Sequence, residues 1–133
     1  MRRFKQEKLW RDKLPEIMQK EHGSIIHIKQ LNDQAFDNEL RIKLLEEAYE
    51  IKLAHTTQAL IEELADLYEV IDTLLALHTI DKEHVLSAQR KKHEERGGFM
   101  QRSYVTVAEH KEGSYGVAYC LADPNKYPEI INE

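Results

Sequence analysis

The sequence lacks the residues and runs on which several classes of protein depend. Its single cysteine, Cys120, excludes an internal disulfide. The seven histidines are spread without the spacing of metal ligands, so a zinc site is not expected. No segment approaches the roughly 18 apolar residues that a membrane-spanning helix needs, and residues 1–4 are not followed by the hydrophobic stretch of a secretory signal. We therefore expect a cytoplasmic protein that does not act at a membrane.

An excess of positive charge is also missing. The net charge of -5 argues against general nucleic-acid binding, which needs a basic surface. Basic residues gather in residues 1–13 and 90–96 and flank an acidic middle; most such runs are solvated faces. At 133 residues, with 41% hydrophobic and 32% charged residues, the chain has the size and composition of one ordered domain.

Capping residues and apolar spacing predict four helices. Pro15 suits the first turn of a short helix, and Gly23 ends it. Asn32 or Asp33, Thr56 or Thr57, and Asp81 are suited to cap the next three. The third has the strongest periodicity, with Leu60, Leu64, Leu67, Ile71 and Leu74 at helical spacing. The expected ranges are about 15–22, 32–55, 57–75 and 81–95.

The pattern changes after Phe99. Residues 104–107 and 115–119 are rich in β-branched and aromatic side chains, and a turn-like segment separates them. These residues predict a β-hairpin, followed by a tail that runs over the surface. The expected architecture is mainly α-helical, a four-helix-type bundle with a short C-terminal β-hairpin or irregular tail.

Four carboxylates have a spacing that points to a common site. Glu47 and Glu50 are three residues apart and share one face of the second helix, and Glu63 and Asp66 do the same on the third. If the two helices form an antiparallel hairpin that bends near residues 56–57, each member of one pair lies level with a member of the other. Glu47 then faces Asp66, and Glu50 faces Glu63.

Such a patch destabilises a fold unless a cation joins it, because like charges a few ångströms apart repel. Mg²⁺ takes carboxylate oxygens as ligands and leaves positions for substrate phosphates. The alternative is an ordinary Glu-rich solvent face, since Glu is a good helix former.

Three further segments complete a resemblance to the all-α nucleoside triphosphate pyrophosphatases, the superfamily of MazG, dimeric dUTPases and phosphoribosyl-ATP pyrophosphohydrolase. The shared Glu-x-x-Glu and Glu-x-x-Asp signature corresponds to the four carboxylates. Residues 8–15, Lys-Leu-Trp-Arg-Asp-Lys-Leu-Pro, are similar to the opening segment of the phosphoribosyl-ATP pyrophosphohydrolase-like house-cleaning branch. Residues 62–71 resemble its central helix, and residues 92–99 resemble its closing Lys-x-x-x-Arg-Gly-Gly-Phe. The resemblance spans residues 8–102.

This resemblance implies an all-α pyrophosphohydrolase-like domain over residues 1–103, with residues 104–133 packed on it. It implies Mg²⁺-dependent cleavage of a nucleotide between the α- and β-phosphates, with Mn²⁺ as a substitute, in a homodimer or higher homo-oligomer. The expected metal ligands are Glu47, Glu50, Glu63 and Asp66. Glu46, Glu47 and Glu50 are expected to be catalytic, with Glu46 orienting or deprotonating the water. Substrate phosphates are expected to meet Arg11, Lys13, Lys92 and Arg96, although Arg11 and Asp12 can instead pair within the fold.

Two other functions fit the same residues. One is a helical module that binds a nucleotide or another partner without turnover. The other is phosphoribosyl-ATP pyrophosphohydrolase activity in histidine synthesis, in place of cleansing of the nucleotide pool. The preferred base and sugar depend on the shape of the pocket, so the metal motif does not identify them.

Overall fold

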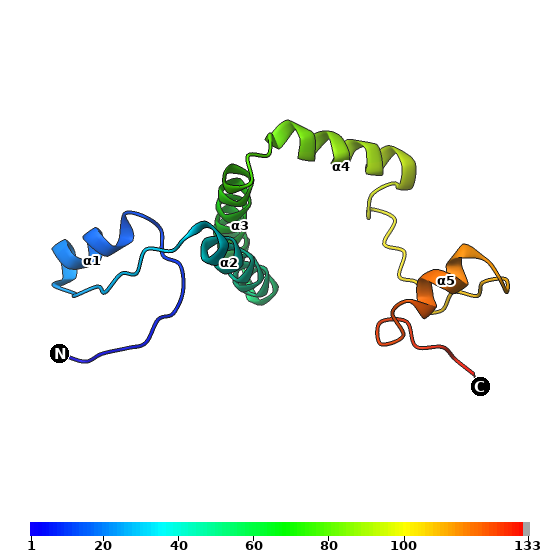
Figure 1. Ribbon diagram of the computed structural model, residues 1–133, viewed down its shortest axis with the longest axis horizontal. Coiled ribbons are helices and arrows are strands. Elements are labelled where there is room, and N and C mark those ends of the chain that lie inside the picture. Colours follow the sequence, from blue (N-terminus) through cyan, green and yellow to red (C-terminus); the bar gives the residue numbers. More distant parts are fainter. Residues whose placement is uncertain (132–133) are drawn as a thin grey trace. The chain divides into compact units, whose positions relative to one another are not determined.

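Five α-helices follow one another in the computed structural model, which describes residues 1–131, and this part of the chain contains no strand (Figure 1). The mainly α-helical class predicted from the sequence is confirmed. No helix in the described residues is long and apolar enough to cross a membrane. The helices are α1 (Leu14–His22), α2 (Asp33–Leu53), α3 (Thr57–Leu77), α4 (Lys82–Arg96) and α5 (Tyr115–Leu121).

The helix ends follow the local chemistry that the sequence indicated. The side chains of Asn32 and Thr56 cap α2 and α3, each accepting a hydrogen bond from the backbone N–H three residues on, at 2.9 and 3.1 Å. Asp81 accepts one from the N–H of the second residue of α4 at 2.9 Å. Gly23, with φ at 66°, ends α1 in the left-handed conformation that glycine adopts without strain. The four predicted helices are therefore confirmed.

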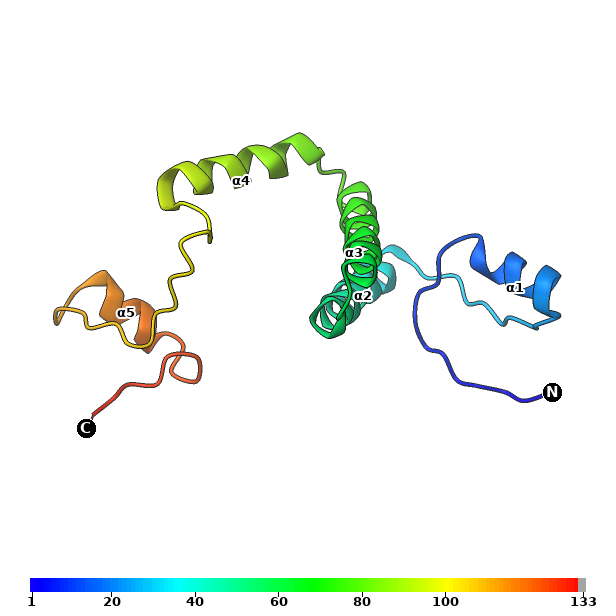
Figure 2. The same cartoon turned by 180° about the vertical axis from the view of Figure 1, so that it is seen from behind.

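Helices α2 and α3 form an antiparallel hairpin, and they lie side by side in both views of the chain (Figures 1 and 2). Residues 54–56 make the turn at one end. At the other end, Nε2 of His78, which follows α3, lies 2.6 Å from Oδ1 of Asp37 in α2. Arg41 Nε donates to the other oxygen of Asp37 at 3.1 Å. The hydrogen bond with His78 and then that with Arg41 lower the pKa of Asp37.

The seam between α2 and α3 holds the most buried side chains of the described chain. Leu40 is 3% exposed and Val70 is 8% exposed. Glu47, which is 7% exposed, lies on the same face of α2 as Leu40, two helical turns nearer the 54–56 turn. The predicted leucine stripe of α3 is only partly in this seam, because Leu60 and Leu64 keep more than a third of their surface exposed. The hairpin therefore buries the carboxylate of Glu47 and leaves several leucines partly exposed.

The remaining helices contribute little to that seam. Neither α1 nor α4 contains a buried residue. Residues 1–94 make up one unit, and a second unit begins at residue 95. The closed four-helix bundle and the domain boundary at residues 103–104, with the tail packed on the bundle, stay predictions.

The predicted β-hairpin is wrong. Residues 104–107 have no regular structure, and residues 115–119 form most of α5. The rings of Tyr115 and Tyr119, one helical turn apart, lie 5.9 Å from each other, so a helix gives these aromatic residues a contact that a lone strand could not. Gly116 has no Cβ to collide with the ring of His110, which lies against it. The last two residues of the predicted tail, 132 and 133, lie outside the described residues.

Candidate metal centre

Three carboxylates meet in the α2–α3 seam. They belong to Glu47 of α2 and to Glu63 and Asp66 of α3, and one oxygen of each lies within 4.8 Å of the others. Glu50 is not in this group. Its side chain is exposed, and it lines a shallow depression beside the turn together with Glu63 and His55. The structure thus brings together three of the four predicted ligands and places Glu50 at the rim beside Glu63.

Helical spacing explains why these carboxylates point inward. Glu47 follows the buried Leu40 by seven residues, which is two turns along the same face. Glu63 precedes the buried Val70 by the same interval, and Asp66 lies between them, one turn from each. The helix faces that carry the core therefore also carry the carboxylates, and the packing of α2 on α3 assembles the cluster.

The electrostatic consequence is clearest at Glu47. Burial raises the pKa of its carboxyl group, and the nearby charges of Asp66 and Glu63 raise it further, while Lys43 acts in the opposite direction. The ammonium of Lys43 lies 3.7 Å from Glu47 Oε1. A buried carboxylate whose charged form is disfavoured is a group that a bound cation would stabilise.

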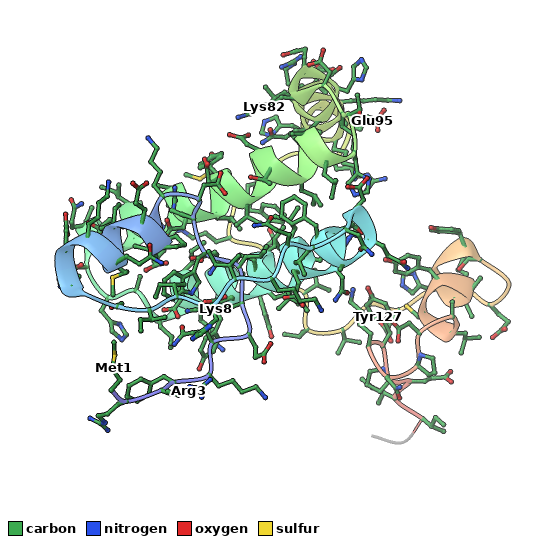
Figure 3. All side chains as sticks on the ribbon, turned by 60° about the vertical axis from the view of Figure 1, so that its left-hand side comes forward. Met1, Arg3, Lys8, Lys82, Glu95 and Tyr127 are labelled. Atoms are coloured by element: carbon green, nitrogen blue, oxygen red, sulfur yellow. The ribbon has the colours of Figure 1, made fainter. Side chains whose placement is uncertain are left out.

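Two lysines beside the cluster hold the neighbouring Glu46. Lys43 Nζ lies 3.2 Å from Glu46 Oε2, and Lys8 Nζ lies 3.5 Å from Oε1. Figure 3 labels Lys8 where the N-terminal segment passes over α2. No motif in the sequence singles out Lys43, although its position three and four residues before Glu46 and Glu47 places it on their helix face. Glu46, expected to orient water, is shared between two ammonium groups in this structure.

Arg11 pairs with a residue of the cluster itself. Its Nη2 donates to Asp66 Oδ1 at 2.6 Å, across 55 positions of sequence. This hydrogen bond raises the pKa of the Arg11 guanidinium. The alternative pairing of Arg11 with Asp12 is not observed.

The other predicted phosphate-binding residues are not brought to the cluster by any ion pair. Lys13 and Lys92 are exposed, and neither forms a salt bridge within residues 1–131. Arg96, at the end of α4, is also exposed and belongs to the second unit. Their roles toward a substrate stay predictions.

The donor set fits a hard divalent cation. All three groups offer oxygen, which Mg²⁺ prefers, and none offers nitrogen or sulfur. Oxygens on opposite sides of Mg²⁺ are about 4.2 Å apart, twice a bond of roughly 2.1 Å. The three oxygens here lie within 4.8 Å of one another, so small side-chain rotations would bring them into range.

No protein-family model, curated protein or solved structure matches this chain. The function is therefore inferred from the residues of the site.

Proposed function

We propose that this protein is a Mg²⁺-dependent nucleotide pyrophosphohydrolase of the all-α nucleoside triphosphate pyrophosphatase kind. It would cleave a nucleoside triphosphate or related nucleotide between the α- and β-phosphates, releasing pyrophosphate and a monophosphate. The expected setting is the cytoplasm, and the expected role is cleansing of the nucleotide pool. Mn²⁺ is expected to substitute for Mg²⁺.

One observation supports this function above the others. Glu47 is 7% exposed and shares its surroundings with two further carboxylates within 4.8 Å. A helix seam normally gains stability by burying apolar groups, whereas Glu47 loses most of its hydration in this seam and is repelled by two partly exposed carboxylates beside it. An arrangement that costs stability is typical of a functional site.

The chain's own residues have separable parts in this mechanism. Glu47, Glu63 and Asp66 would hold the cation, with Glu50 reaching it from the rim. The cation would neutralise charge on the phosphates and lower the pKa of an attacking water. Glu46, adjacent to the ligands, would orient that water once one of its two lysine partners turns away.

The phosphate groups need positive partners as charge develops on them. Arg11 already lies at the cluster, and its guanidinium fork can bind two phosphate oxygens at once. The family resemblance implies three further phosphate-binding candidates, Lys13, Lys92 and Arg96. Lys8 and Lys43 add positive charge beside Glu46 and would favour the approach of an anionic substrate.

The proposed function is tested by a substrate panel. The purified full chain with Mg²⁺ is expected to release pyrophosphate from at least one member of a set of ordinary and damaged nucleoside triphosphates and phosphoribosyl-ATP. Chelation of the metal is expected to stop the reaction. Pyrophosphate is measured by a coupled assay, and the nucleotide product by mass spectrometry.

The outcomes separate the competing functions. Turnover of phosphoribosyl-ATP alone favours the histidine pathway, and turnover of damaged nucleotides favours pool cleansing. Thermal stabilisation by a nucleotide without any product favours a binding module. If no member of the panel is cleaved, the proposed enzyme is contradicted.

The proposal includes a homodimer or larger homo-oligomer, because the hairpin is apolar outside its seam as well. Two exposed stripes run at helical spacing along its helices. On α2 they comprise Ile42, Leu45, Tyr49 and Leu53, and on α3 they comprise Leu60, Ile61, Leu64 and Tyr68. Exposed apolar stripes of this length are typical of surfaces that another helix covers.

Light scattering tests the assembly. The wild-type chain is expected to have the mass of at least two copies, and Leu45→Glu, at a position 68% exposed in the single chain, is expected to lower it. Glu83→Gln, on the exposed surface of α4, is the control and should leave the mass unchanged. A wild-type mass of one chain at every concentration would contradict the oligomer.

A further inference from the structure

The N-terminal segment and the carboxylate cluster are joined by a contact between two charged groups that have different expected tasks. Arg11 is a candidate phosphate-binding residue, and Asp66 is a candidate metal ligand. Their side chains meet at 2.6 Å, closer than the 3.7 Å between Lys43 and Glu47, the other ion pair of the cluster in residues 1–131. While this pair is formed, one oxygen of Asp66 accepts a hydrogen bond from the Arg11 guanidinium.

A cation and the Arg11 guanidinium would therefore use the same carboxylate. Asp66 Oδ1 accepts the hydrogen bond from Arg11, and an Asp66 oxygen is also one of the three possible ligand atoms. Two positive charges at one carboxylate repel each other. Arg11 can withdraw easily, since its side chain is 59% exposed and lies on a segment without regular structure.

We infer that Arg11 is a displaceable latch on the metal site, which a divalent cation releases from Asp66 and thereby frees for the phosphates of the substrate. This inference rests on the proposed function, since it takes the cluster to be the metal site. Binding would then be ordered, with the cation first and the nucleotide second. Before the cation binds, the latch gives Asp66 a partner and keeps the phosphate-binding group occupied.

The expected size of the effect is modest. Partly exposed ion pairs contribute up to about 1 kcal/mol, which corresponds to roughly a fivefold change in an equilibrium constant. The cation must break the Arg11–Asp66 pair in order to bind. Replacing Arg11, which removes this pair, is therefore expected to tighten cation binding by about two- to fivefold. By reciprocity, the bound cation loosens the hold of Asp66 on the N-terminal segment by the same factor.

The experiment compares Mg²⁺ binding by calorimetry in the full-length wild type, Arg11→Gln and Lys8→Gln. Arg11→Gln removes the latch. Lys8→Gln removes a nearby positive charge while leaving the Arg11–Asp66 pair intact, so it measures general electrostatics. Arg11→Gln is expected to bind Mg²⁺ more tightly than both other proteins.

The second measurement is the fluorescence of Trp10, the only tryptophan in the chain. It is half-buried and adjacent to Arg11, so it reports movement of the segment. Saturating Mg²⁺ is expected to shift the wild-type emission to longer wavelength as the indole becomes hydrated, and to do so much less in Arg11→Gln. A general charge effect would not produce this difference.

Each outcome has a distinct meaning. Mg²⁺ binding with equal affinity in wild type and Arg11→Gln overturns the latch and leaves the proposed function intact. If wild type binds Mg²⁺ but its Trp10 emission does not change, the latch is again overturned and the proposed function is left intact. If neither protein binds Mg²⁺, or if Asp66→Asn binds it as tightly as wild type, both the metal site and the latch are overturned.

Discussion

Glu47→Gln is expected to reduce Mg²⁺-dependent pyrophosphate release at least about 100-fold. Changing a group that only hydrogen-bonds to a metal ligand costs up to about 100-fold, and Glu47 is expected to be a ligand itself. The amide preserves the size of the side chain but removes its negative charge. The same substitution should leave the fold at least as stable, because burial disfavours the charge that it removes. Activity is measured by the pyrophosphate assay and stability by urea denaturation.

Activity is expected to fall while the stability of the fold is kept or increased, so the two measurements distinguish loss of a metal ligand from unfolding. Loss of activity through unfolding would lower stability as well. Glu39→Gln is the matched control, since it makes the same chemical change on α2, eight residues before Glu47 and outside the cluster. Glu39→Gln should retain full activity. Wild-type turnover in Glu47→Gln would show that the carboxylate cluster is not the catalytic centre.

Leu40→Ala is expected to be the most destabilising of the simple core substitutions. Leu40 is 3% exposed, and together with Val70 it forms the buried apolar part of the seam among the described residues. Truncating a buried leucine to alanine costs about 2–5 kcal/mol, because apolar contacts are lost and a cavity remains. With so few buried apolar groups, the hairpin has little else to hold α2 against α3. Urea denaturation followed by circular dichroism measures the loss.

The comparison for this prediction is Leu86→Ala. Leu86 lies on α4, which contains no buried residue, so the same truncation removes less packing. Its cost should stay near the roughly 0.5 kcal/mol typical of surface positions. Equal losses in the two variants would mean that the α2–α3 seam does not control stability.

Local chemistry made the helices predictable from the sequence. Asn32 and Thr56 cap their helices through side-chain oxygens, and Gly23 ends α1, so each boundary depends on residues within a few positions of it. Tyr115 and Tyr119 misled for the opposite reason. Their preference for strands depends on a neighbouring strand to pair with, and the described chain offers none.

The site was predictable in its residues but not in its contacts. The three-residue spacing and the bend identified Glu47, Glu63 and Asp66 as neighbours, because helical geometry fixes which positions share a face. The same geometry could not show that the side chain of Glu50 stays outside the cluster. It also could not show that Arg11 reaches Asp66, since that contact depends on the path of a segment without regular structure.

Only three residues separate α2 from α3, which limits how the hairpin can change in length while its carboxylates stay together. One residue inserted into α3 before Glu63 would rotate that carboxylate by about 100° and move it about 1.5 Å along the axis, out of the seam. Insertions that restore the cluster must add whole helical turns to both arms together. The distance in sequence between the two acidic motifs is thus expected to vary among functional chains in steps of about seven residues, two turns shared between the helices.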